Sequence, residues 1–106
     1  MPKLLVNVSY TAEGAKGLLA HGGTARVEAS RAAIESVGGT MESFYFAFGS
    51  DDAIIIADLP DHAAAAGLAL TVAATGFVTS RMTVLLTAEE IDAGVARPVE
   101  FTPPGG

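Results

Sequence analysis

The segment "TMESFYFAFGSDDAIIIADLP", residues 40–60, decides the fold of this chain. It contains two apolar runs rich in aromatic and β-branched residues, which are typical of β-strands. Between them lies "GSDD", residues 49–52, whose composition indicates a turn. Two strands joined this tightly pair as an antiparallel hairpin. Alternation along the first run places two sets of side chains on opposite faces, Phe44, Phe46 and Phe48 on one and Ser43, Tyr45 and Ala47 on the other.

Two more strands are predicted outside the hairpin. "KLLVNVSY", residues 3–10, and "FVTSRMTVLL", residues 77–86, are rich in aliphatic and β-branched residues. With a helix predicted after the first strand and another after the hairpin, the order is strand, helix, strand, strand, helix, strand. This order is typical of an α+β, ferredoxin-like βαββαβ fold, in which a four-stranded antiparallel sheet carries two helices on one face. The other face has no helix from the same chain.

The two helices are recognised by their spacing and their caps. The first is predicted over residues 24–37, where apolar side chains recur at helical spacing, after a short irregular helical turn that ends at the Gly22–Gly23 pair. The second follows the expected N-cap Asp61 and ends near Thr75. Beyond the last strand, residues 87–90 form a Ser/Thr-x-x-Glu capping box, which predicts a short third helix.

Length and composition bound the classes of function. The 106 residues fit a single domain, expected over residues 1–96, with an extended Pro- and Gly-rich tail over residues 97–106. The net charge is −6 and the six Lys and Arg residues are dispersed, so neither nucleic acid nor a membrane surface is an expected partner. The absence of cysteine excludes disulfides and thiolate chemistry. The apolar run near the N-terminus is too short for a secretory signal, so we expect a cytoplasmic protein.

The second helix carries almost no charge. Its polar residues are His62, Thr71 and Thr75, and its many alanines give it a thin profile. Helices of a two-layer domain normally expose a polar side. The outer flank of this helix is therefore either weakly apolar and exposed, or packed against a second subunit.

The sheet face without helices is the stronger reason to expect self-association. A sheet face with substantial apolar content normally needs a cover. A second copy that packs sheet against sheet provides it and gives a symmetric homodimer or a larger oligomer. The residues expected on this face are Leu5, Asn7, Ser9, Ser43, Tyr45, Ala47, Thr79, Arg81, Thr83 and Leu85.

Four segments of the sequence resemble the GYD-domain family. They are "SYTAEGAKGLL" at residues 9–19, "GG" at 22–23, "ESFYFAFGSDDAIIIADLPD" at 42–61 and "RMTVLLTAEE" at 81–90. The family is bacterial, and its relatives are dimeric α+β barrel proteins of ferredoxin-like fold, which include cofactor-free monooxygenases. The resemblance, over about residues 3–90, implies this fold and no cofactor. Of the Gly, Tyr, Asp signature at the hairpin turn, Gly49 and Asp52 match, whereas Asp51 stands where the tyrosine is expected.

Four residues near the open face are candidates for ligand binding or for an interface. Arg81 is an isolated positive charge in a long uncharged region, and it is predicted to share the face with Tyr45 and Asn7. A guanidinium there can bind a carboxylate or phenolate through paired hydrogen bonds, while Tyr45 can supply a hydroxyl or a stacking ring. Alternatively, Arg81 forms an ion pair with Glu42 or with a carboxylate of a partner subunit and closes the interface.

The two histidines are weaker candidates. His62, in the first turn of the second helix, is either an acid or base, since free histidine titrates near ~6.5, or an ordinary exposed residue. His21 either lines the mouth of a pocket or lies in a surface loop. Nothing in their spacing places them together, so no metal site is expected. Asp51, Asp52 and Asp58 are expected at turns and strand ends rather than as calcium ligands.

Two functions of different classes fit these observations. The first is a homo-oligomeric binding or assembly protein that holds a small apolar ligand between sheet and helices. The second is a cofactor-independent enzyme, monooxygenase- or isomerase-like, acting on a small aromatic or polyketide-like compound. Its polar groups would be Tyr45, Arg81 and His62, but the predicted alternation points Tyr45 and Arg81 away from the pocket between sheet and helices. No catalytic residue is assigned.

Overall fold

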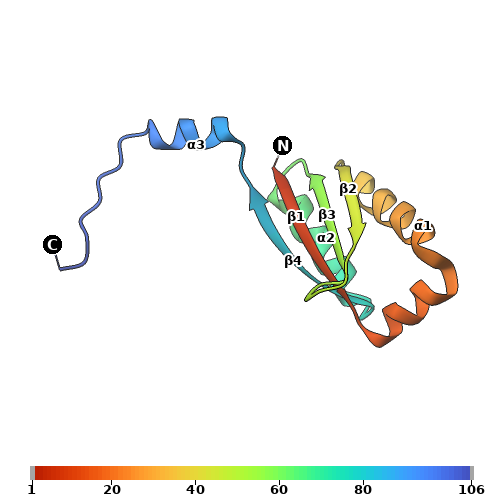
Figure 1. Ribbon diagram of the computed structural model, residues 1–106. Helices are drawn as coiled ribbons and strands as arrows, with labels where there is room; N and C mark the ends of the chain where they lie inside the picture. Colours follow the sequence, from red (N-terminus) through yellow and green to blue (C-terminus); the bar gives the residue numbers. More distant parts are fainter. Residues whose placement is uncertain (1, 106) are drawn as a thin grey trace.

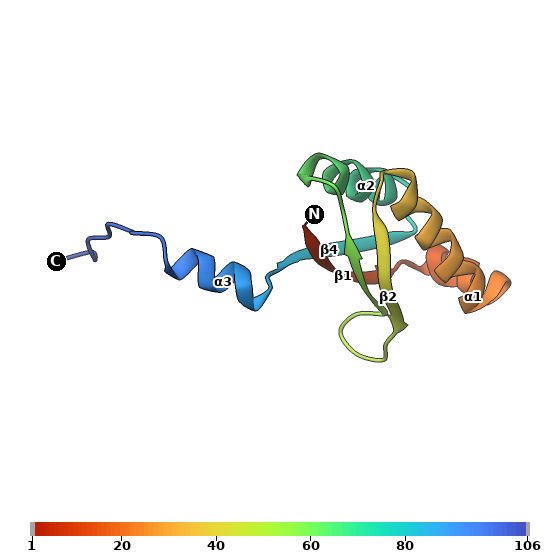
Figure 2. The ribbon, with the colours of Figure 1, turned by 90° about the horizontal axis from the view of Figure 1, so that it is seen from above.

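A four-stranded antiparallel sheet with two helices on one face forms the body of the molecule (Figures 1 and 2). The computed structural model describes residues 2–105. The strands lie in the order β2-β3-β1-β4. This arrangement confirms the predicted ferredoxin-like α+β fold. The elements are β1 (Lys3–Tyr10), α1 (Ala12–Ser36), β2 (Thr40–Phe46), β3 (Ala53–Asp58), α2 (His62–Ala74), β4 (Val78–Leu85) and α3 (Ala88–Val95).

The core lies between the two central strands and the helices. Alternation turns every second side chain of β1 and β3 toward the helical layer, where these side chains are buried. Leu59, just after β3, is only 1% exposed and completes the core together with Ile34 of α1. The buried set is small and entirely apolar: Leu4, Val6, Val8, Ile34, Ala53, Ile55, Ala57 and Leu59.

Helix α1 bends sharply at Gly22. There the backbone has φ 83° and ψ 171°, which lies outside the helical region and is accessible to glycine at little cost. The predicted break at this position is confirmed, but the first half is a helix rather than an irregular turn. Its start is fixed because Thr11 donates its backbone N–H to the Phe77 carbonyl oxygen at 3.0 Å and caps the helix through its side chain.

Strand β2 is shorter than the sequence predicts. It ends at Phe46, and its register with β3 shifts between Met41 and Ser43. Phe44 packs against the core and contacts the ring of Phe46, with 5.0 Å between the ring centroids. Phe48 is fully exposed in the loop. The prediction that Phe48 shares one strand face with Phe44 and Phe46 is therefore wrong, because the chain leaves the strand after Phe46.

Helix α2 is only half covered within one chain. Asp61 caps it as predicted, accepting a hydrogen bond from the Ala64 N–H at 2.8 Å. Ala65 and Leu68 pack against the core, whereas Leu70 on the outer flank is 71% exposed. The helix has 13 residues and is about 20 Å long at ~1.5 Å per residue. Within residues 2–105 no helix has the length and apolarity to cross a bilayer.

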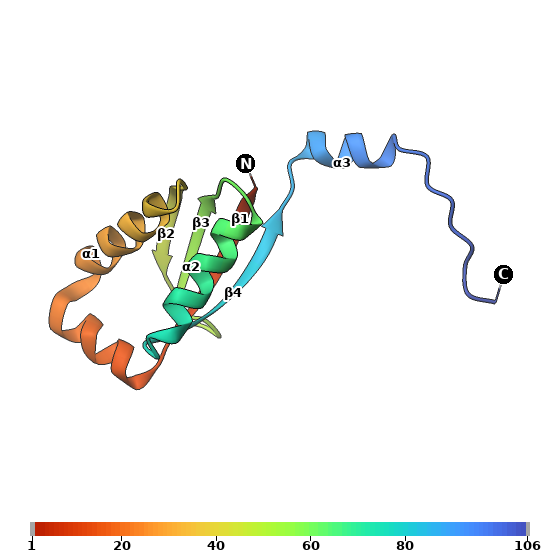
Figure 3. The same ribbon diagram turned by 180° about the vertical axis from the view of Figure 1, so that it is seen from behind.

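The chain beyond β4 leaves the body as an arm, residues 86–105 (Figures 1 and 3). Its helix α3 starts with the predicted capping box, in which the side chains of Thr87 and Glu90 each bond the other's backbone N–H. The arm extends the molecule to 57 Å in its longest dimension. Five large apolar side chains of the arm are at least half exposed, Leu86, Ile91, Val95, Val99 and Phe101.

The close approach of α1 to the start of β4 generates a prediction about two glycines of one helix. A Cβ at Gly14 would overlap the carbonyl oxygen of Phe77, whereas a Cβ at Gly17 meets nothing within 4 Å. We expect Gly14→Ala to lower the free energy of unfolding by about 1–3 kcal/mol through overpacking. Gly17→Ala should raise it by about 0.5–1 kcal/mol through helix propensity.

Urea unfolding at one fixed protein concentration measures both variants, because association would otherwise shift the apparent stability. Equal stabilities of the two alanine variants would contradict the close packing of α1 against Phe77.

Candidate functional site

A cavity of about 200 Å³ lies between the sheet and the two helices. Its floor is formed by the inward side chains of the central strands and its walls by α1 and α2. Most of the lining is apolar, because the inward side chains of the strands that form the core also face the cavity. The small alanines of α2 leave this space unfilled. The main apolar contributors are Val6, Val8, Ile55, Ile34, Leu68 and Val72.

The polar groups of the cavity include Tyr10 and Arg26. Arg26 lies on α1 and is exposed, and it is the only charged residue among the lining residues. Burial raises the pKa of the Tyr10 phenol above its usual value, with Asp52 acting in the same direction and Arg26 opposing. Tyr10 is therefore protonated at neutral pH and available as a hydrogen-bond donor. Ser30, Thr75 and Ser80 add hydroxyl groups to the lining.

A second hollow, of about 410 Å³, runs along the first half of the bent helix α1. His21 and Glu13 line it, so His21 lies at a pocket, one of the two positions considered from the sequence. Four residues line both hollows: Tyr10, Arg26, Phe77 and Val78. The two hollows therefore meet where the side chains of Tyr10 and Arg26 lie.

The face of the sheet away from the helices carries Tyr45, Asn7 and Arg81 in one row. Tyr45 pairs with Ile54, Ile54 with Asn7, and Asn7 with Arg81. Three inter-strand spacings of about 4.8 Å separate the ends of the row, so Tyr45 and Arg81 are about 14 Å apart at the backbone. Both residues lie on the predicted face, but they do not act together on one small group.

Asp51 is the centre of a polar cluster at one end of this open face. Its carboxylate accepts hydrogen bonds from Arg81 Nη2 at 2.8 Å, Asn7 Nδ2 at 3.1 Å and Ser9 Oγ at 3.5 Å. The Asp51 side chain is only 14% exposed, whereas that of Arg81 is 71% exposed. Within this chain, Arg81 thus pairs with Asp51 and not with Glu42. Asn7 and Arg81 thus share one partner, Asp51, which the sequence predicted only as a turn residue.

Backbone contacts hold the loop between β2 and β3 in this position. The Asp52 carboxylate accepts a hydrogen bond from the Tyr10 N–H, and the Asp52 N–H donates to the Val8 carbonyl oxygen, both at 2.8 Å. The Ala47 N–H donates to the Asp52 carbonyl oxygen at 2.9 Å. Ala47 therefore lies in this loop and not in β2, contrary to prediction. The loop is folded back over the ends of β1 and β4, which places Asp51 above them.

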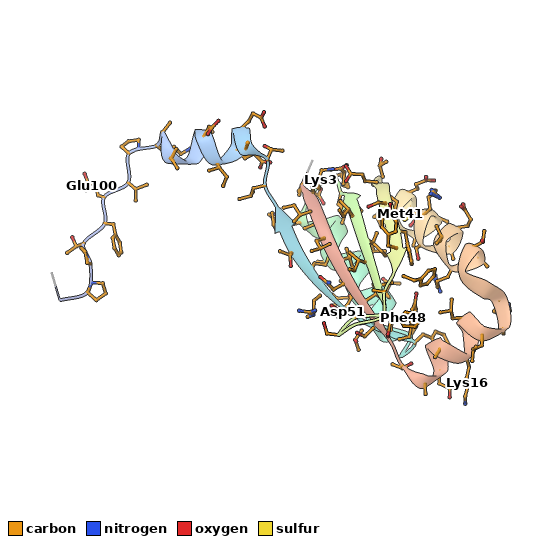
Figure 4. The ribbon with its side chains drawn as sticks, viewed as in Figure 1. Lys3, Lys16, Met41, Phe48, Asp51 and Glu100 are labelled. Carbon is orange, nitrogen blue, oxygen red and sulfur yellow. The ribbon has the colours of Figure 1, made fainter. Side chains whose placement is uncertain are left out.

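Glu42 lies at the opposite end of the open face, as the positions of Lys3 and Asp51 in Figure 4 indicate. Its carboxylate binds Lys3 Nζ at 2.6 Å, and Asp58 binds the same ammonium at 3.3 Å. The hydrogen bond that Lys3 donates to Glu42 raises the pKa of Lys3, with Asp58 acting in the same direction. Between this cluster and Asp51 the two central strands present apolar side chains, with Ser43 and Thr83 beside them on the outer strands. Leu5, Ile54 and Ile56 form this strip, which we call the apolar centre of the open face.

His62 is the first residue of α2 and is exposed. It lines neither hollow, and the same is true of Tyr45 and Arg81. The three polar groups considered for an enzyme are therefore not assembled around one cavity. Among residues 2–105, no group of three or more His, Asp or Glu side chains is placed to hold a metal ion.

Comparison with known protein families identifies one family for this chain. The family model of the GYD domain matches residues 4–95. The chain belongs to the GYD-domain family. The match runs from β1 to the end of α3, so it includes the first part of the arm. No curated protein and no solved structure gives a match.

The contacts of Asp51 generate a prediction about the hairpin loop. Asp51→Ala removes the common acceptor of three side chains, so we expect the free energy of unfolding to fall by about 1–3 kcal/mol. Ser50→Ala, a change at the exposed neighbouring residue, should alter it by less than about 0.5 kcal/mol. Urea unfolding compares the two variants. If they are equally stable, the carboxylate does not hold the loop.

Proposed function

We propose that this GYD-domain protein is a cytoplasmic, homo-oligomeric binding protein that holds a small apolar ligand between its sheet and helices. The observation that carries the proposal is the apolar cavity of about 200 Å³. An engineered apolar cavity of about 150 Å³ in another protein is large enough to bind benzene. The cavity here has room for a single ring or a short aliphatic chain.

The chemical character of the cavity supports binding rather than catalysis. Small-molecule sites typically combine apolar walls with a few polar groups that orient the ligand. Here the core strands supply the walls, and the polar groups gather at the side of Tyr10 and Arg26. Tyr45, Arg81 and His62, the groups considered for an enzyme, lie outside it. The cavity therefore favours a bound ligand without assigning it a reaction.

The open face supports the proposed self-association. Its apolar centre, Leu5, Ile54 and Ile56, is flanked by the Lys3–Glu42 cluster at one end and the Asp51–Arg81 cluster at the other. An apolar centre with a polar rim is typical of protein interfaces. A second copy turned by a two-fold axis would set the apolar centres against each other.

The arm adds apolar surface that its own chain does not cover. Ile91 and Val95 are one helical turn apart on α3, and they are 50% and 79% exposed. Contacts of such a helix stripe with another subunit would remove it from water and add to the stability of an oligomer.

A pair of alanines in α2 tests the binding function. Ala69 lines the cavity and Ala66 lies on the exposed flank of the same helix. We expect toluene, titrated as a neutral probe, to shift the NMR signals of Phe44 and Met82, which line the cavity. Ala69→Leu should abolish these shifts by filling the space, whereas Ala66→Leu should retain them. The absence of shifts in the unmodified protein would refute the binding function.

A second pair of variants tests the interface. Light scattering at micromolar concentration should give an oligomer for the unmodified protein. Ile56→Glu places a carboxylate in the apolar centre of the open face and should give a monomer, because an unpaired charge there is costly to bury. Leu70→Glu, on the flank of α2, should leave the mass unchanged. A monomeric unmodified protein would overturn self-association, and dissociation by Leu70→Glu alone would overturn the choice of the open face.

A further inference from the structure

We propose that the ligand of the cavity is an amphipathic carboxylate, a medium-chain or single-ring acid, whose anionic head binds at Arg26 and Tyr10. This inference rests on the proposed binding function and specifies its ligand class. The apolar body of the ligand would occupy the cavity of about 200 Å³. The head group would lie where the cavity meets the second hollow.

Arg26 provides the first argument. Four other cationic side chains of the chain, Lys3, Lys16, Arg31 and Arg81, each form an ion pair with a carboxylate. Within residues 2–105, Arg26 and Arg97 have no such partner, and Arg97 lies in the arm, away from the cavity lining. Arg26 is also the only charged residue that lines the cavity, in a protein of net charge −6. A guanidinium presents a planar fork of donors that matches a carboxylate.

Tyr10 provides the second argument. It lines both hollows together with Arg26, and it is close enough that Arg26 acts to lower its pKa. Burial outweighs that effect and raises the pKa, so the phenol keeps its proton and has an O–H to donate to a carboxylate. The nearby carboxylate of Asp52 already accepts the backbone N–H of Tyr10. Two donors, one charged and one neutral, thus line the junction of the two hollows, where the head group would lie.

The electrostatics of the lining provide the third argument. No Asp or Glu side chain lines the apolar cavity itself. The nearest carboxylates are Glu13, which lines the adjoining second hollow, and Asp52, whose charge acts on the pKa of Tyr10, and Arg26 is the cation that faces them at the junction. Arg26 is exposed, so a carboxylate bound to it stays partly hydrated and avoids the full cost of burying a charge. An apolar cavity that ends at an exposed guanidinium therefore matches a molecule with one apolar and one anionic end.

Titration calorimetry with octanoate and octan-1-ol tests the inference, because the two probes share a chain and differ in the head group. In the unmodified protein, octanoate should bind more tightly than octan-1-ol. Arg26→Gln should weaken octanoate binding by about tenfold or more, the loss expected for a charge-assisted hydrogen bond, and leave octan-1-ol unchanged. Tyr10→Phe should weaken octanoate binding by a smaller factor.

The matched control is Arg31→Gln, five residues further along α1 and paired with Glu28. It removes the same charge from the same helix without touching the cavity lining, so it should leave both affinities unchanged. Equal loss of octanoate affinity in Arg31→Gln and Arg26→Gln would overturn the site. Octan-1-ol binding as tightly as octanoate would overturn the anionic ligand class but leave the binding function intact. Failure of both probes to bind would count against the binding function as well.

Discussion

The two central strands carry aliphatic side chains on both faces, while the chain supplies helices for only one. In β3, Ile55 lies under the helices and is buried, whereas Ile54 and Ile56 point to the opposite side. In β1, Val6 and Leu5 divide in the same way. Because one pleated strand cannot turn all its side chains toward one layer, the second face stays apolar at its centre. The shape of the core and the apolar centre of the open face both follow from this mismatch, and the second of these is the basis of the proposed self-association.

The cavity follows from the thinness of the helical layer. The side chains that α2 turns inward include Ala65 and Ala69, which reach little distance toward the sheet. On the other side, Gly22 bends α1, so that its first half runs away from the axis of its second half (Figure 3). Small residues in one helix and a bend in the other leave space that the short inward side chains of β1 and β3 do not fill. The hollow is therefore a result of residue size and backbone conformation.

Local sequence patterns predicted the elements and their caps. The features that they did not predict depend on contacts between residues far apart in the sequence. The order of strands and helices along the chain, the inward residues of β1 and the caps at Asp61 and Thr87 depend on neighbours in sequence, and each is confirmed. The end of β2 at Phe46 and the position of Asp51 depend on hydrogen bonds to residues about 40 positions away, which no local pattern contains.

Two further features were missed from the candidate site. Arg26 and Tyr10 come together only because β1 and α1 fold onto the same cavity, and neither residue stands out in the sequence. Ile54 and Ile56, in contrast, could have been predicted from the sequence. The alternation that assigns Leu5 to the open face assigns them to it as well. Because they were not included among the residues expected there, the face is more apolar than predicted.

The loop that Asp51 secures also limits how another sheet can approach. It rises over the ends of β1 and β4, so that this end of the sheet is screened by the molecule's own backbone. A sheet packed on this face would meet the middle rows and the Lys3 end, while Asp51 would cover Asn7 and Arg81 at the β1 and β4 side of the row that also holds Ile54. In a two-fold pair, the two screening loops would stand at opposite corners and act as stops, which fixes how far one sheet can slide across the other.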